Sequence, residues 1–235
     1  MSATFGDYCP IAVGAESFAE RWTPLILREL FLGSRRFNEI HRGVAKMSRT
    51  LLSQRLRELE RRSILERHEA GGLVEYRLTP AGQELEPIVF ALGHWAAKWS
   101  FGDPADEDLD VAWLVWRLHQ FIEPSRLPGQ RTVLHFVLGG VGGGEGWLVL
   151  DHGESTACQI DPGYDVDLVV QGDNREMHRW FLGGLSFRDM QKAGHIRFIG
   201  PSKLARAFPS WFRDGLFADT IRQFGAKEVV PASVA

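Results

Sequence analysis

The chain has 235 residues, of which 44% are hydrophobic and 24% are charged, a composition typical of globular proteins and long enough for two domains. No apolar run approaches the ~18–20 residues of a membrane helix, and the N-terminus lacks the pattern of a secretory signal, so we expect a cytoplasmic protein with no membrane partner. The net charge of −3 does not by itself indicate a nucleic-acid partner, and two cysteines 149 positions apart give no indication of a disulfide framework.

The charge is unevenly distributed. Residues 1–100 carry 14 Lys and Arg against 12 Asp and Glu, whereas residues 101–235 carry 13 against 18. Between Arg35 and Arg67, ten cations face only Glu39, Glu58, Glu60 and Glu66. A solvated helix face with paired charges is one interpretation of this cluster. A nucleic-acid contact is the interpretation that we favour, because the arginines outnumber their possible partners.

The first hundred residues predict four helices in succession. The first has Pro10 in its first turn, and the second begins at Thr23-Pro24 and ends at Gly33. A short third helix over 37–42 and a longer basic fourth helix from about Ser48 to Arg62 have the spacing of a helix-turn-helix. Two apolar segments, 64–69 and 74–78, joined at Ala70-Gly71-Gly72, suit a β-hairpin wing. A long final helix is expected over 80–99.

The fourth helix is the predicted recognition helix. Leu52, Leu56 and Leu59 form one buried stripe, which leaves the polar residues on the opposite side. Side chains that contact base edges and cations that contact phosphates are both needed for DNA binding. The candidates in and beside this helix are Arg35, Arg36, Ser48, Arg49, Thr50, Ser53, Gln54 and Arg57, and those in the wing are Arg67, His68 and Arg77.

These residues resemble the HxlR-type winged helix-turn-helix regulators, which are close to the MarR regulators. The resemblance covers about Cys9–Trp99 and includes Arg21-Trp22-Thr23, Arg36-Phe37-Asn38-Glu39-Ile40 and Val74-Glu75-Tyr76-Arg77-Leu78-Thr79-Pro80. It implies a homodimeric transcription regulator that binds a roughly palindromic operator in double-stranded DNA. This chain has Arg21 where the family usually has Lys, and it continues for 136 residues beyond Trp99.

Residues 101–235 predict a second domain, separated from residues 1–100 by a Gly-, Pro- and Asp-containing linker over 100–108. We expect a helix over 109–121, then strands over 132–138, 147–150, 156–160 and 166–170. Capping boxes at Asp173 and Ser186 should begin two helices, followed by a strand over 196–199 and a last helix over 201–212. The expected fold class is α+β, with an antiparallel sheet and flanking helices in this domain.

This second part is similar to the sterol-carrier-protein-like fold. The similarity rests on 147–151, 157–168, 179–183 and 194–200. It implies a pocket for an apolar ligand between sheet and helices, and it transfers no catalytic residue. The aromatic candidates for this pocket, for each of which core packing is the competing interpretation, are Trp113, Phe136, Trp147, Trp180 and Phe187.

The sequence contains little evidence for a metal, cofactor or catalytic site. The histidines are scattered, with no metal-ligand spacing, and no cofactor is expected. The glycine-rich run 139–146 matches no phosphate-binding loop and is interpreted as a flexible hairpin loop. No nucleophile motif is present, so an enzyme is not expected. Cys9, at a predicted helix N-terminus, has a possible redox role, and Cys158 is expected in the core.

We therefore expect a cytoplasmic homodimeric regulator, acting as a repressor, whose helices over 10–22 and 80–99 form the dimer interface and whose second domain senses a hydrophobic small molecule. One alternative is a lipid or small-molecule carrier that uses the winged helix only to dimerise. Another is a protein-interaction module whose acidic second domain binds a basic partner.

Overall fold

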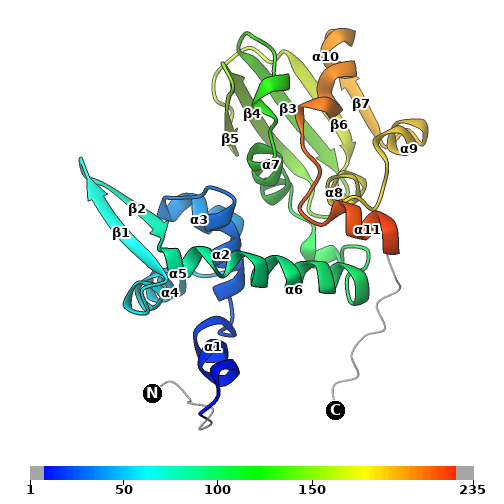
Figure 1. Cartoon of the computed structure of the whole chain (residues 1–235). Coiled ribbons are helices and arrows are strands. Elements are labelled where there is room, and N and C mark those ends of the chain that lie inside the picture. The colour runs from blue at the N-terminus through cyan, green and yellow to red at the C-terminus, as the bar shows by residue number, and fades with distance from the viewer. Residues whose placement is uncertain (1–7, 226–235) are drawn as a thin grey trace. The chain divides into compact units, whose positions relative to one another are not determined.

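The structure, a computed structural model, describes residues 8–225, and the chain folds as two compact units, Met1–Leu92 and Gly93–Ala235 (Figure 1). The division falls within a helix, ahead of the predicted boundary after residue 100. Among the described residues, no helix is both long and apolar enough to cross a bilayer.

Unit one has the predicted order of helices followed by a hairpin. Pro10 occupies the first turn of the first helix and Ser48 caps the fourth, its hydroxyl accepting from the Leu51 amide at 3.3 Å. The elements are α1 (Pro10–Phe18), α2 (Thr23–Phe31), α3 (Phe37–Gly43), α4 (Arg49–Arg61), β1 (Leu65–Ala70), β2 (Leu73–Leu78), α5 (Pro80–Gln83) and α6 (Glu86–Trp99).

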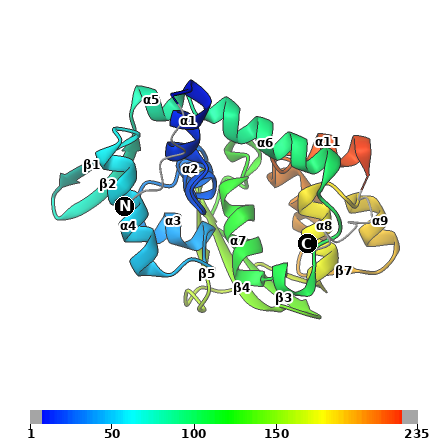
Figure 2. The ribbon, with the colours of Figure 1, turned by 90° about the horizontal axis from the view of Figure 1, so that it is seen from below.

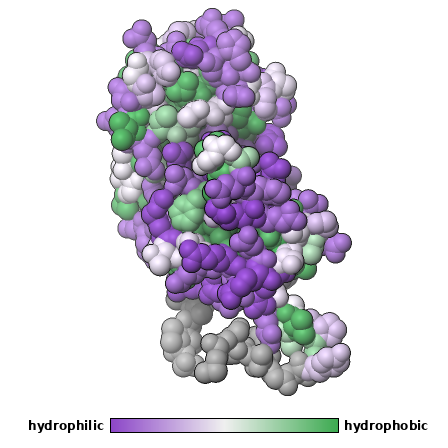
Figure 3. Space-filling view, turned by 90° about the vertical axis from the view of Figure 1, so that its left-hand side faces the viewer, coloured by the Kyte–Doolittle hydropathy of each residue, from purple (hydrophilic) through white to green (hydrophobic). Residues whose placement is uncertain are grey.

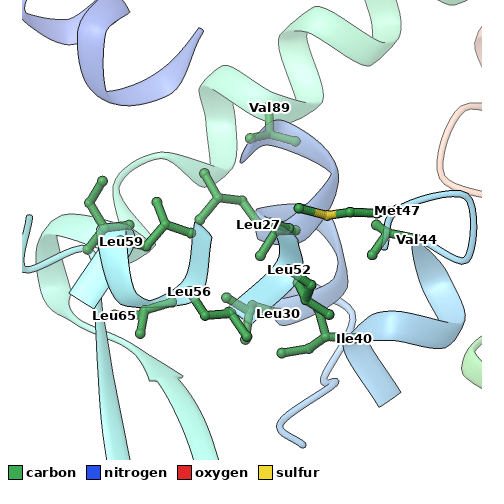
Figure 4. Packing of buried hydrophobic residues seen from close by; sticks show 12 residues of the cluster. Leu27, Leu30, Ile40, Val44, Met47, Leu52, Leu56, Leu59, Leu65 and Val89 are labelled. Atoms are coloured by element: carbon green, nitrogen blue, oxygen red, sulfur yellow. The ribbon is translucent and has the colours of Figure 1, made fainter. Parts of the chain in front are cut away.

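The core of unit one lies where α2, α3 and α4 meet (Figure 4). Leu52, Leu56 and Leu59 form the predicted buried stripe of α4, each at most 2% exposed. They pack with other buried side chains from α2, α3, α6 and the turn between α3 and α4, among them Ile26, Leu27, Leu30, Ile40, Val44, Met47 and Val89. Because this stripe fixes the rotation of α4 about its axis, the opposite side of α4 is exposed to solvent.

The wing is a two-stranded antiparallel hairpin in which Ala70 pairs with Leu73. Gly71 and Gly72 connect the strands with φ of +60° and +78°, the left-handed conformation that a two-residue hairpin turn requires and that glycine adopts without strain. The Tyr76 amide donates to the Arg35 carbonyl at 2.7 Å, which joins the wing to the segment before α3.

Three helix predictions for unit one are corrected. The helix predicted over 80–99 is divided into α5 and α6, because Pro87 has no N–H to continue the helical hydrogen bonds across residues 84–85. The first helix ends at Phe18 rather than at Trp22. The helix predicted from Thr23-Pro24 to Gly33 ends at Phe31, and its N-cap is Trp22, which is in the left-handed conformation at φ +78°.

Unit two contains a five-stranded sheet in the order β5-β4-β3-β6-β7. Its α+β class is the one expected, but β3 and β6 are parallel, so the sheet is mixed rather than antiparallel. The strands are β3 (Thr132–Gly139), β4 (Gly144–Asp151), β5 (Glu154–Cys158), β6 (Leu168–Asp173) and β7 (Ile196–Ile199).

The helices of unit two lie on one side of this sheet (Figure 2). A Cβ on Gly146 of β4 would meet Val115 at 3.0 Å, which places one helix on that face, and Phe136 of β3 contacts Phe208 on the same face. The helical segments are α7 (Val111–Gln120), α8 (Asn174–Leu182), α9 (Phe187–Lys192), α10 (Ser202–Ala207), α11 (Ala218–Phe224) and three short 3-10 turns, η1 (Asp106–Asp108), η2 (Pro124–Arg126) and η3 (Phe208–Trp211).

Two predictions for the helices of unit two are confirmed, and a third is corrected. Asp173 and Ser186 accept hydrogen bonds from the amides of Glu176 and Asp189, both at 3.1 Å, at the starts of α8 and α9. The last predicted helix, over 201–212, is wrong: α10 ends at Ala207 and η3 follows, since Pro209 cannot continue it. Helix α11 was not predicted.

The segment predicted as a linker is attached to α8. Arg175 donates to the Pro104 carbonyl and to Asp106, and Arg179 forms an ion pair with Asp103 at 3.0 Å. The glycine-rich run is likewise an ordered hairpin between β3 and β4, and the Gly142 carbonyl accepts from the Val111 amide at 3.0 Å. A Cβ at Gly142 would lie 1.8 Å from the Leu109 carbonyl oxygen, so this position needs glycine for close packing as well as for its φ of +63°.

Candidate nucleic-acid interface

Most of the predicted DNA-binding residues in and beside α4 are exposed to solvent. Ser48, Arg49, Thr50, Gln54 and Arg57 are exposed, and Ser53 is half-buried. Gln54 and Arg57 also border an open surface depression together with Glu60 and Arg61. Figure 3 faces the side of the molecule that carries the wing, and strongly hydrophilic side chains cover much of the surface seen there. The structure therefore presents one polar helix face beside a β-ribbon, the arrangement that enters a DNA major groove in winged-helix proteins.

The exposed cations differ in their pairing. Within residues 8–225, neither Arg36 nor Arg57 forms an ion pair, which leaves both guanidinium groups available for phosphates. Glu58, which follows Arg57 in the chain, is used by Arg61 and Arg62. The hydrogen bond from Arg62 is the largest of the effects that lower the pKa of Glu58.

Arg35 differs from the prediction. Its guanidinium is turned toward the protein, where Nη1 donates to the carbonyls of Leu30 at 2.7 Å and Ser34 at 3.2 Å. Its amide and that of Arg36 both donate to the Glu39 carboxylate, at 2.8 and 2.9 Å, and this carboxylate caps α3. The geometry gives Arg35 a structural role at the base of the wing, so we expect it to keep these contacts rather than to bind a phosphate.

The wing cations are exposed but paired along their own strands. Arg67 forms an ion pair with Glu69 at 3.0 Å, and Arg77 with Glu75 at 2.9 Å. His68 contacts Glu66 at 3.1 Å. Exposed pairs of this kind contribute ~0–1 kcal/mol, so a phosphate could replace either carboxylate at little cost. Contact of Arg67 and Arg77 with DNA stays a prediction.

Helix α3 contacts the first residue of α4, an arrangement that the sequence did not predict. Nη2 of Arg49 donates to Oδ1 of Asn38 at 2.8 Å, and the Arg49 guanidinium lies 4.9 Å from the centroid of the Phe37 ring. Asn38 is an exposed polar residue eleven positions before Arg49, so no periodicity relates the two in sequence.

The five predicted ligand residues of unit two are not gathered in one place. Trp180 and Phe187 contact each other at 5.5 Å between centroids, and Phe208 connects them with Phe136. Trp113 lies apart, stacked on His178 at 5.6 Å. Trp147 pairs in register with His135, whereas Phe136 pairs with Gly146, so Trp147 lies on the sheet face opposite Phe136.

The two cysteines are not bonded to each other. Cys9 is the half-buried N-cap of α1, as predicted, and its redox role stays a prediction. Cys158 was predicted to lie in the core, but it is half-buried at the end of β5. No cluster of potential metal ligands occurs within the described residues.

The fold and this surface define a winged helix-turn-helix protein of the DNA-binding type. The family model of HxlR-like helix-turn-helix proteins matches residues 18–103. The chain is 35% identical over 97 residues to the uncharacterised HTH-type transcriptional regulator YvaP of Bacillus subtilis (strain 168), covering 40% of this chain and 90% of that relative. It is 34% identical over 94 residues to YtfH of Escherichia coli (strain K12), covering 39% of this chain and 75% of the relative. This protein belongs to the HxlR-like family of transcriptional regulators.

Crystal structures show the same partial match. The putative transcription factor PA1607 is 29% identical with a TM-score of 0.40, over 43% of this chain and 71% of that one. The redox regulator HypR in its reduced form is 32% identical with a TM-score of 0.35, over 37% of this chain and 90% of that one. The family assignment rests on the sequence relatives, and the family model ends at residue 103, before most of unit two.

Proposed function

We propose that this protein binds a palindromic DNA operator as a homodimer and acts there as a repressor, with α4 in the major groove and the wing beside it. The observation that carries this proposal is the surface of α4, where Arg49, Gln54 and Arg57 are exposed and the leucine stripe of the same helix is fully buried. Arg suits guanine and Gln suits adenine in the major groove, and Arg57 is available for a phosphate.

An exposed apolar face on α6 supports dimerisation. Ile88, Leu92, Trp95 and Trp99 recur at spacings of four, three and four residues, and each is about half exposed, between 47% and 57%. Ile11 and Val13 of α1 are exposed as well, at 81% and 58%. Large apolar side chains along one helix face are typical of an interface, and a two-fold dimer would match the symmetry of a palindromic operator.

Unit two is proposed to bind an apolar small molecule that changes operator affinity. Its sterol-carrier-like character is part of this proposal, and helices on one face of a five-stranded sheet support it. The aromatic cluster of Trp180, Phe187, Phe198, Phe208 and Phe212 lies on the helical side and is the most suitable lining. A ligand that fits one dimer geometry better than another would shift DNA affinity by linkage.

The proposal is tested by selection of the full-length protein on a random pool of ~20-base-pair duplexes, followed by measurement of the mass of the complex. We expect enrichment of an inverted repeat with half-sites about one helical turn apart, bound by two chains. Enrichment of no sequence, with apolar probes still bound by unit two, would instead favour a carrier. Salt-sensitive binding to a basic protein, without sequence enrichment, would favour an interaction module.

A further inference from the structure

The Arg49 guanidinium is held by two residues of α3 in the absence of DNA. Asn38 Oδ1 accepts one N–H from Nη2 at 2.8 Å, and the Phe37 ring lies under the guanidinium carbon at 4.9 Å. A cation over an aromatic face is attracted by the ring. The Phe37 ring and the hydrogen bond to Asn38 together restrain the position of the guanidinium.

The Phe37 ring beneath Arg49 is itself held in place by His41 of the same helix. The Phe37 ring is stacked on His41 with an interplanar angle of 8° and centroids 6.3 Å apart. His41 Nε2 donates to the Met47 carbonyl at 3.0 Å, and Met47 immediately precedes the N-cap of α4. Contacts from α3 therefore reach α4 at two neighbouring points, the backbone before its cap and the side chain of its first residue.

This arrangement matters because an arginine side chain is otherwise flexible. Ordering such a side chain costs rotamer entropy, and a side chain ordered before binding does not lose that entropy on DNA. Arg57, two turns further along α4, forms no ion pair in the described part of the chain and is the natural comparison. Asn38 uses one of the five guanidinium N–H groups of Arg49, which leaves four for a base that needs two.

We propose that Asn38 and Phe37 are positioning residues that fix the Arg49 guanidinium for a two-bond contact with a guanine, and so set the base preference at one position of each half-site. This inference rests on the proposed function, because it requires α4 to lie in the major groove. The opposite role for Asn38, holding Arg49 away from DNA, predicts that its removal strengthens binding.

The first test needs no DNA. In the full-length protein, nitrogen-15 relaxation of the arginine Nε–H groups should show Arg49 more ordered than Arg57. Asn38→Ala and Phe37→Leu should each make Arg49 as mobile as Arg57, whose own relaxation should not change. Equal mobility of Arg49 and Arg57 in the wild type would overturn the inference whether or not the protein binds DNA.

The second test compares the sequences that variants select from the random duplex pool. Arg49→Ala should lose ~10-fold or more of the preference for one G·C pair per half-site, within the ~1–3 kcal/mol of a good bidentate contact. Asn38→Ala should lose part of the preference at the same base pair, with binding to a scrambled duplex unchanged. The double variant should be no worse than Arg49→Ala alone, because both changes remove one interaction.

Three outcomes would overturn the positioning role: an unchanged preference in Asn38→Ala, a loss that adds fully to that of Arg49→Ala, or tighter binding. If the wild type selects no sequence, the proposed function fails and the readout role fails with it. The relaxation measurement then still decides whether α3 orders Arg49, so the two failures are distinguishable. Asn38→Gln, which keeps the amide acceptor on a longer side chain, should restore more of the preference than Asn38→Ala.

Discussion

The carboxylate of Glu29 lies directly against the α-carbon of Gly43. A Cβ on Gly43 would be 1.9 Å from Oε2 of Glu29, a side chain that is completely buried. Arg28 connects the same two residues, because its Nε donates to Glu29 Oε1 and its Nη2 to the Gly43 carbonyl, both at 3.0 Å. The C-terminus of α3, where the chain turns toward α4, is thus fixed on α2 by a buried charge that requires a glycine.

We therefore expect Gly43→Ala to destabilise unit one by ~1–3 kcal/mol, because the added methyl group must displace a buried, hydrogen-bonded carboxylate. Urea unfolding followed by circular dichroism measures this change. Gly14→Ala in α1 is the matched control: no atom lies within 4 Å of its Cβ position, so replacement of a helical glycine should be neutral or stabilising by up to ~1 kcal/mol. Equal effects of the two substitutions would contradict the role of Glu29.

The exposed arginines and the inward-turned Arg35 should contribute differently to the salt dependence of DNA affinity. Arg36→Ala and Arg57→Ala should each reduce the slope of log affinity against log salt by about 0.9, the value for one lost phosphate contact on duplex DNA. Arg35→Ala should leave the slope unchanged but lower the melting temperature, because its guanidinium donates to two backbone carbonyls. Anisotropy titrations at several salt concentrations measure the slopes, and a reduced slope for Arg35→Ala would contradict this division.

His178 predicts a loss of stability in mild acid. It is 1% exposed, Nδ1 donates to the Asn174 carbonyl at 2.8 Å, and burial is the main effect that lowers its pKa below 6.5. Because the unfolded chain then binds the proton before the folded chain does, the free energy of unfolding should fall as the pH drops through 6.5.

Urea unfolding of the wild type at pH 8 and at pH 5.5 measures this contribution. His178→Gln should be less stable at pH 8 but lose less stability on acidification. His195→Gln, at an exposed position, should behave as the wild type. The same pH dependence in all three proteins would show that His178 is not responsible.

The part of α6 from Gly93 onward belongs to unit two, and there it contacts α11 and the residue before it. A Cβ on Gly93 would lie 2.1 Å from the Phe217 ring, and His94 Nδ1 is 2.7 Å from Thr220 Oγ1. Gly93→Ala should therefore destabilise the protein by ~1–3 kcal/mol, although the same change in an open helix is stabilising. In a Phe217→Ala background the penalty should disappear, which a double-mutant cycle measures. Equal penalties in both backgrounds would exclude the contact as the cause.

The sequence predicted elements that are determined by local patterns. The leucine stripe of α4, the Ser48 cap and the Gly71-Gly72 turn each depend on a few neighbouring residues, and the structure has all three. The pairing of strands that are far apart in the sequence was harder to predict. The parallel contact of β3 with β6 involves strands separated by two others in the chain, and no periodicity specifies which strand lies at the centre of a sheet.

For the candidate site, too, the features set by local pattern were predicted and those set by contacts between helices were not. The exposed side of α4 follows from its buried side, whereas the orientation of a single side chain depends on contacts between helices. Arg35 and Arg36 are adjacent cations, yet one is turned inward and the other is exposed. The support of Arg49 by Phe37 and Asn38 could not be foreseen, because it depends on how α3 packs beside α4.

The central claim is that this protein binds a specific DNA sequence through α4. The most direct measurement is fluorescence anisotropy of the full-length protein on the upstream DNA of its own gene and on a scrambled duplex, at two salt concentrations. We predict tighter binding to the upstream duplex, with a preference that persists at the higher salt and is lost in Arg49→Ala. Equal binding to both duplexes that disappears at the higher salt, in wild type and variant alike, would contradict the claim for this site.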